Sequence, residues 1–279
     1  MGPLDGIRVV TTALNVPGPV ACARLQALGA SIAKVEPPEG DPLQGFARGW
    51  YEALHEGVEI GRLDLKSDTG RRAMASMLGT ADLLVTAQRP SALARMGLAP
   101  EALARFARLC HVAIVGHAKG DAQAPGHDLT YLAACGLVRP GALPPTLFAD
   151  MAGAERAVSA ALTLLYARGR GGARTAAVSL AEVAATLAQP LAAGLTRPGA
   201  VVGGGFAGYH LYEARKGWIA VAALEPRFAR RLAEKFALPE LSVEALGKVF
   251  SAHDAEYWEA WGADNDLPIV ALRDPSNVS

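Results

Sequence analysis

An alternation of short apolar runs with helical segments, spanning the first 115 residues, constrains the fold more than any other feature. Apolar runs with the length of buried strands lie at residues 7–13, 31–35, 81–87 and 109–115. Between them, Pro17 and Ser67 are helix-starting residues, and Gly29 is placed to end the first helix. Strands that alternate with helices form a parallel sheet. We therefore predict an α/β fold, with the ligand site at the carboxyl edge of the sheet.

Irregular backbone is expected at residues 39–61, followed by a brief extended piece at residues 63–65. The pattern changes after residue 150, where we expect a long helix to about Arg168, a strand at 175–178 and a second alanine-rich helix at 180–193. Residues 195–205, with one proline and four glycines, are expected to form a hinge.

A smaller α+β domain is predicted beyond the hinge. Residues 209–213 and 218–223 favour an antiparallel hairpin, and short helices follow to about residue 262. We place a large parallel-sheet (Rossmann-like) domain at residues 1–197 and the small domain at 198–264. Residues 265–279 are expected to complete the large domain. Their apolar segment, residues 267–272, is expected to pack on that domain or on a second subunit.

The composition excludes several classes of protein. Hydrophobic residues make up 51% of the 279 residues, enough to bury a core. Lys+Arg and Asp+Glu are both 27, so the formal net charge is zero, which argues against a nucleic-acid or membrane-surface partner. The longest apolar run is too short to span a bilayer, and the N-terminus has no signal-peptide pattern. With three cysteines in apolar contexts, Cys22, Cys110 and Cys135, we expect a soluble cytoplasmic protein with reduced thiols.

Two segments resemble a dinucleotide-binding motif and a zinc site, but neither fits the full pattern. The segment Gly203–Gly208 fits G-x-G-x-x-G, but a strand is expected after it, whereas the dinucleotide motif requires a helix. Cys110, His111 and His117 match no established zinc spacing, and the first two point to opposite faces of a strand. We therefore expect neither a nicotinamide cofactor nor a metal.

Chemistry-bearing residues gather between Gly126 and Gly153. His127 and Asp150 each lie where a loop meets an apolar, helical run, so each head group is free to face a cleft. Apolar neighbours are expected to raise the pKa of Asp150 and to make it a base or a nucleophile. The alternative is structural, with Asp150 as a helix cap and His127 as an ordinary loop residue. Arg89 and Arg95 follow a strand and are either phosphate ligands or surface arginines.

Several segments taken together resemble the family III CoA-transferases, which include the alpha-methylacyl-CoA racemases. The matching segments, in order, are Pro3–Val9, Pro17–Pro19, Leu28–Ala30, Lys34–Pro42, Leu63–Ser67, Ala81–Val85, Arg89–Pro90, Met96–Leu98, Gly203–Gly205 and Val221–Phe228. The resemblance implies a substrate, acyl-CoA, and an aspartate at Asp150 that attacks the thioester. It also implies a homodimer. The chain ends at Ser279, short of the family's usual length.

Racemases of this family add a histidine in a Gly-His-Asp motif, which this chain shows as Gly126-His127-Asp128. Racemisation needs one group that removes the α-proton and another that returns it. Glu225 resembles the residue that orients the imidazole or pairs with its charged form. We favour a racemase of 2-methylacyl-CoA, with CoA transfer through Asp150 and a non-catalytic CoA-binding relative as the alternatives. The resemblance implies that coenzyme A binds through Val16, Pro17, Lys34, Arg62, Leu65, Lys66, Arg89 and Arg95.

Overall fold

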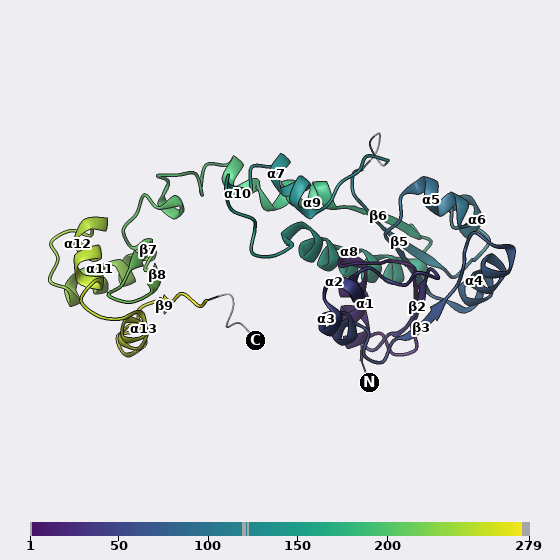
Figure 1. Ribbon diagram of the computed structural model, residues 1–279, viewed down its shortest axis with the longest axis horizontal. Coiled ribbons are helices and arrows are strands. Elements are labelled where there is room, and N and C mark those ends of the chain that lie inside the picture. Colours follow the sequence, from purple (N-terminus) through teal and green to yellow (C-terminus); the bar gives the residue numbers. More distant parts are fainter. Residues whose placement is uncertain (1, 119–120, 122, 275–279) are drawn as a thin grey trace. The chain divides into compact units, whose positions relative to one another are not determined.

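The computed structural model describes residues 2–118, 121 and 123–274, which form two compact units, Met1–Ala188 and Gln189–Ser279 (Figure 1). The boundary lies before the predicted hinge rather than after residue 197. Pro190 lacks the backbone N–H that an uninterrupted helix through this position would need. The predicted helix at 180–193 therefore divides into α9 (Leu180–Leu187) and α10 (Gln189–Ala192).

A six-stranded sheet forms the centre of the first unit. Its strand order is β3-β2-β1-β4-β5-β6, and every neighbouring pair is parallel, which confirms the predicted fold class. The strands are β1 (Arg8–Thr11), β2 (Ser31–Glu36), β3 (Glu59–Arg62), β4 (Leu83–Thr86), β5 (Cys110–Val115) and β6 (Thr175–Ser179). The helices of this unit besides α9 are α1 (Pro17–Ala27), α2 (Leu43–Phe46), α3 (Arg48–Leu54), α4 (Asp68–Thr80), α5 (Pro90–Arg95), α6 (Pro100–Leu103), α7 (Asp128–Ala134) and α8 (Phe148–Arg168).

Residues 39–61 are more ordered than the sequence suggested, since they contain α2, α3 and most of β3. The strand beside β2 is Glu59–Arg62 and not the extended piece predicted at 63–65. All four residues of β3 are exposed at the edge of the sheet, so the strand lacks the apolar alternation by which strands are recognised.

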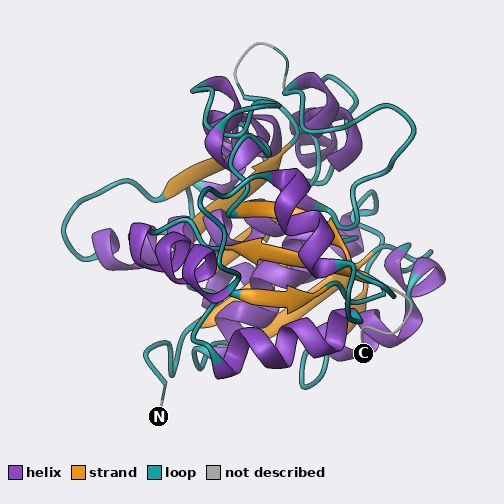
Figure 2. Ribbon diagram, turned by 90° about the vertical axis from the view of Figure 1, so that its left-hand side faces the viewer, coloured by secondary structure: helices purple, strands orange, loops and turns teal. Residues whose placement is uncertain are grey.

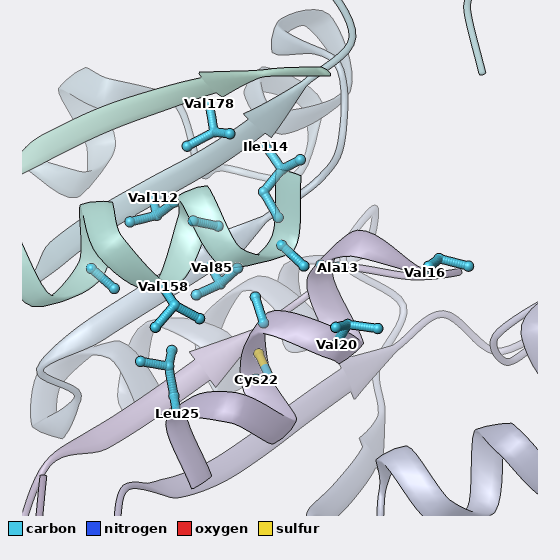
Figure 3. Packing of buried hydrophobic residues seen from close by; sticks show 14 of the residues in the cluster. Ala13, Val16, Val20, Cys22, Leu25, Val85, Val112, Ile114, Val158 and Val178 are labelled. Atoms are coloured by element: carbon cyan, nitrogen blue, oxygen red, sulfur yellow. The ribbon is translucent and has the colours of Figure 1, made fainter. Parts of the chain in front are cut away.

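Successive strand residues point to opposite faces of the sheet, and each face has its own core. Helices cover both faces (Figure 2), and Figure 3 shows part of one of the two cores. On one face, Val9 and Val85 pack with residues of α1 and α8. On the other, Val10 and Leu84 pack with Met74 of α4 and with residues of α5 and α6. The sheet is therefore buried between two helical layers, as a parallel sheet requires.

The second unit begins with α10, and its described residues also contain a three-stranded antiparallel sheet, β7-β8-β9, a short 3-10 helix and three longer α-helices. Its elements besides α10 are η1 (Val201–Gly203), β7 (Tyr209–Glu213), β8 (Trp218–Ala222), α11 (Pro226–Lys235), α12 (Val243–Phe250), α13 (Ala255–Asp264) and β9 (Ile269–Ala271). The β7–β8 pair is the predicted hairpin, and β7 follows the glycine segment Gly203–Gly208 as expected.

Residues 265–274, which were expected to complete the large domain, belong to the second unit, and residues 275–279 lie outside the described residues. Within the apolar segment 267–272, β9 pairs with β8, and Leu267, Ile269 and Ala271 are buried in the core of the second unit. The contact with α13 is close, since a Cβ added at Gly262 would lie 2.9 Å from the Ile269 Cβ. This segment therefore completes the smaller sheet.

Among the described residues, no helix combines the length and the apolarity needed to cross a membrane. The longest, α8, has 21 residues. All three cysteines are free, and burial raises the pKa of the Cys22 thiol to about 11, so this thiol is unreactive at neutral pH.

Candidate active site

The carboxyl ends of β1 and β4 form the point where the chain direction across the sheet reverses. From β1 the chain proceeds to β2 and β3 on one side, and it then returns to β4 on the other. The loops after these two strands diverge, and such a crevice is where open α/β sheets bind ligands. Two pockets lie here on either side of Leu14, at the edge that the sequence predicted.

The first pocket, called here the Asp150 pocket, has a volume of about 170 Å³. It brings together four of the predicted site residues, which are Pro17, Arg89, His127 and Asp150. They come from the start of α1, the residue before α5, the residue before α7 and the first turn of α8. Residues separated by more than 130 positions in sequence therefore face one cavity.

Asp150 is half-buried in the first turn of α8. Its carboxylate accepts no hydrogen bond from the described residues. Burial raises the pKa of Asp150 to about 7, and the nearby Asp128 carboxylate adds to the rise. The sequence predicted this direction from the apolar neighbours. A carboxyl group with this pKa is ionised in part at neutral pH and is free to act as a base or as a nucleophile.

Asp128 is the functional residue that the sequence analysis missed. Its carboxylate is buried, and Oδ1 accepts the backbone N–H groups of Ala149 at 2.7 Å and Asp150 at 3.0 Å. It thus caps α8, although it belongs to α7 and lies 21 residues before Ala149. Asp150 is not the cap, because α8 begins at Phe148 and its N-cap residue is Leu147. An aspartate in the Gly-His-Asp motif was the available signal, but its partner helix is distant in sequence.

His127 is the N-cap residue of α7, and it is exposed. Its backbone N–H donates to Thr130 Oγ1 at 3.1 Å, so the backbone at this position is fixed while the side chain lines the Asp150 pocket. Two residues with acid–base side chains, His127 and Asp150, therefore line the same pocket, as a two-group acid–base mechanism requires.

The second pocket, called here the Lys66 pocket, has a volume of about 280 Å³. Leu65 and Lys66, both predicted to bind CoA, lie in its wall, and Gln88 closes it at the end of β4. Val16, Arg62 and Arg95 line neither pocket. Val16 is buried beside α1, whereas the two arginines are exposed.

The structure does not fit the predicted role of Lys34 as a CoA ligand. Lys34 is only 1% exposed, and its Nζ lies 2.5 Å from Asp41 Oδ2, 3.2 Å from Glu36 Oε1 and 2.8 Å from His55 Nε2. A buried ammonium with three partners has no surface for a phosphate. The acidic and imidazole groups around it have the composition of a metal site, but the Lys34 ammonium, in contact with all three, takes the place of a cation among them.

The Lys34 cluster does reach the site indirectly. Asp41 Oδ1 accepts the backbone N–H of Asn15 at 3.0 Å and that of Leu43 at 2.9 Å. Asn15 has a left-handed backbone, with φ of 63°, and it lines the Asp150 pocket. The cluster therefore holds a strained wall of the pocket in place.

Glu225 belongs to the second unit, where it is exposed and precedes α11. Its role in orienting the imidazole stays a prediction.

The family model described as CoA-transferase family III matches residues 4–279, nearly the whole chain. The chain belongs to CoA-transferase family III. The resemblance drawn from the sequence is therefore confirmed at the level of the family, whose members handle CoA thioesters.

Relatives within family III have CoA-transferase names. The chain is 27% identical over 205 residues to a "Probable fatty acyl-CoA transferase" of Mycobacterium tuberculosis, covering 66% of this chain and 52% of the relative. It is 31% identical over 168 residues to the cinnamoyl-CoA:phenyllactate CoA-transferase of Clostridium sporogenes, covering 51% and 39%. The chain thus spans about half the length of these relatives.

Solved structures support the fold. A hypothetical protein from Mycobacterium tuberculosis matches 98% of this chain and 85% of its own, with a TM-score of 0.83 and 23% identity. A CAIB/BAIF family protein from Brucella suis matches 99% of this chain and 85% of its own, with a TM-score of 0.78 and 20% identity.

Proposed function

We propose that this chain moves CoA between carboxylic acids, with Asp150 as the nucleophile. One observation carries the proposal: a half-buried carboxylate with no hydrogen-bond partner among the described residues faces a pocket at the switch point of the sheet. The CoA-transferase names of the relatives support transfer over the racemisation that the sequence led us to favour.

The chemistry needs no further reactant. An Asp150 oxygen attacks the thioester carbonyl, the C–S bond breaks, and the CoA thiolate leaves a mixed anhydride. The thiolate then attacks the aspartyl carbonyl, which releases the donor acid and leaves CoA on Asp150. An acceptor carboxylate attacks the carbonyl of that aspartyl thioester, which displaces the CoA thiolate and forms a new mixed anhydride with Asp150. The thiolate then attacks the carbonyl carbon that came from the acceptor acid. The new acyl-CoA is released and the Asp150 carboxylate is regenerated.

The second candidate is exchange of the α-proton of a 2-methylacyl-CoA. A specific observation favours it, namely that His127 lines the same pocket as Asp150. Two titratable groups facing one substrate are suited to remove a proton on one side and to return it on the other.

One experiment separates the two reactions. The protein is incubated with a 2-methylacyl-CoA in heavy water, with and without succinate as the acceptor acid, and both deuterium uptake and succinyl-CoA are measured. CoA transfer that Asp150→Asn abolishes and His127→Gln retains is the expected result. Deuterium uptake that requires both residues, without transfer, would replace transfer by racemisation. A protein that binds CoA and performs neither reaction would be a non-catalytic relative.

Binding is measured separately, so that loss of chemistry is not confused with loss of substrate. A ligand selective for the folded state, at a hundredfold excess over its Kd, stabilises that state by about 2.7 kcal/mol. CoA should therefore raise the melting temperature. Arg89→Ala should reduce this shift, because Arg89 is exposed at the Asp150 pocket. Asp150→Asn should preserve it.

A further inference from the structure

We propose that the Tyr131 hydroxyl is a catalytic group that donates a hydrogen bond to the acyl oxygen of the bound thioester. The proposal rests on the proposed reaction at Asp150 and adds a residue to it. Tyr131 lies in α7, and nothing in its sequence context marked it for this role.

The hydroxyl is a polar group without a structural task. Tyr131 is 4% exposed, and no described residue forms a hydrogen bond with its phenolic oxygen. Every fully enclosed side-chain nitrogen or oxygen of the described, non-exposed residues does have a hydrogen-bond partner. The Tyr131 oxygen is therefore not fully enclosed. Tyr131 forms part of the wall of the Asp150 pocket, as do Gly116 and Gly126, the two glycines beside its phenolic oxygen. A buried phenol normally finds a partner, and none of the described residues supplies one, so the hydroxyl is available to water or to a ligand in the pocket.

Two glycines leave room for this phenol. A Cβ added at Gly116 would lie 2.4 Å from the Tyr131 oxygen, and one added at Gly126 would lie 2.6 Å from it. In both cases the three nearest atoms belong to Tyr131. Neither glycine has a positive φ, so the backbone itself does not require glycine at these positions. The glycine of the Gly-His-Asp motif therefore has a physical explanation, since any side chain there would displace the tyrosine.

The neighbours of the ring fix its direction. The His117 ring packs edge-on against it, with centroids 5.3 Å apart and planes at 80°. Burial raises the pKa of Tyr131, the Asp150 charge raises it further, and Arg89 opposes the rise. The phenol consequently keeps its proton at neutral pH, and it lies within electrostatic range of the nucleophile.

A neutral donor at this place serves the proposed reaction. When Asp150 attacks the thioester, negative charge develops on the carbonyl oxygen, and a fixed donor stabilises that charge. The proton stays on the phenol throughout, so the electron and proton balance of the transfer is unchanged. The same bond would stabilise an enolate if the protein exchanged the α-proton instead.

The first test is kinetic. Tyr131→Phe removes only the hydroxyl, and kcat should fall on the order of a hundredfold, the effect of removing one oxyanion donor. The melting temperature should not fall, because no hydrogen bond to the described residues is lost. Tyr212→Phe is the matched control, since the Tyr212 hydroxyl is also buried but donates to the Ala207 carbonyl at 2.6 Å in the second unit. It should lower the melting temperature and leave kcat unchanged.

The second test does not depend on turnover. In an Asp150→Ala background, the Kd values of acetyl-CoA and S-ethyl-CoA are compared, because the two ligands differ only in the acyl oxygen. A neutral hydrogen bond predicts about three- to tenfold tighter binding of acetyl-CoA, and Tyr131→Phe should abolish that preference. If Tyr131→Phe keeps the preference and wild-type kcat, or if no preference exists, the proposal is overturned. If the preference depends on Tyr131 but the wild-type protein transfers no CoA, the proposed function fails and the oxygen-binding role stands.

Discussion

At the scale of single residues, Asp150 owes its chemistry to its surroundings. The N–H groups of its helix turn are occupied by Asp128, so the Asp150 carboxylate is held in the pocket without a bond of its own. Lys34 is the opposite case, a charge whose partners are all internal. Asp150 is therefore available for reaction, whereas Lys34 stabilises the fold.

Asp150→Asn should stabilise the protein at neutral and higher pH. The pKa of Asp150 is about 7 in the folded protein and its ordinary value is 3.8, so the folded protein keeps this proton up to a higher pH than the unfolded chain does. The wild type therefore loses stability as the pH rises from about 4 to about 7. Half of the pKa shift, taken to allow for solvent screening, corresponds to about 2 kcal/mol. Thermal unfolding of the wild type and of Asp150→Asn at pH 4 and pH 8 measures this difference in stability. Equal pH dependence of the two proteins would contradict the expectation.

Lys34→Met should unfold the protein more easily without a selective effect on CoA. It leaves Glu36 and Asp41 buried without their cation, which costs about 3–5 kcal/mol. Arg62→Met is the matched control, because Arg62 is exposed and lies 4.0 Å from the same Glu36 carboxylate. Its cost should stay below about 1 kcal/mol. Urea unfolding gives both values. If Lys34→Met leaves the stability unchanged but abolishes the rise in melting temperature with CoA, Lys34 is a CoA ligand and the structural role is wrong.

At the scale of elements, α7 supplies the residue that caps α8. Asp128, the first residue of α7, caps α8, whose N-terminal turn carries Asp150. The orientation of the nucleophile thus depends on the docking of two helices rather than on one of them.

Asp128→Asn should move the pH profile of the reaction. The amide oxygen preserves the cap, but the charge that adds to the effect of burial on the pKa of Asp150 is removed. The acidic limb of kcat/KM against pH should shift to lower pH, since the nucleophile is then ionised earlier. Asp128→Ala serves as the comparison, because it also loses the cap, at a cost of about 1 kcal/mol. A profile that stays in place in Asp128→Asn would show that burial alone sets the pKa.

At the scale of the whole molecule, both pockets are lined by residues of the first unit alone. CoA should therefore slow hydrogen exchange in the segments after β1, β3 and β4, and it should leave β7 and β8 unchanged. Mass spectrometry of the full chain with and without CoA measures this. Equal protection of both sheets would mean that the ligand contacts more than these pockets.

The homodimer stays a prediction. Sedimentation velocity of the full chain should give twice its mass of 29.0 kDa. Truncation after Ala263 would not be a clean test, because it removes β9 and exposes the core around Ile269. A monodisperse monomer at micromolar concentration would contradict the prediction.

The sequence by itself determined the features that depend on neighbouring residues. Apolar runs predicted five of the six strands of the large sheet, and Ser67 was predicted as the cap of α4, where its Oγ accepts the Gly70 N–H at 3.0 Å. The ligand edge of the sheet followed from the same alternation, because strand order and crossover helices are regular.

Only the tertiary structure decided which distant groups meet. The burial of Lys34, the capping of α8 by Asp128 and the pairing of β9 with β8 each depend on residues that folding brings together. Sequence patterns report periodicity within one element, whereas charge compensation and capping are satisfied by whichever partner lies near in space. For this reason the sequence predicts Lys34 as a ligand residue and marks neither Asp128 nor Tyr131, although both lie within four residues of His127.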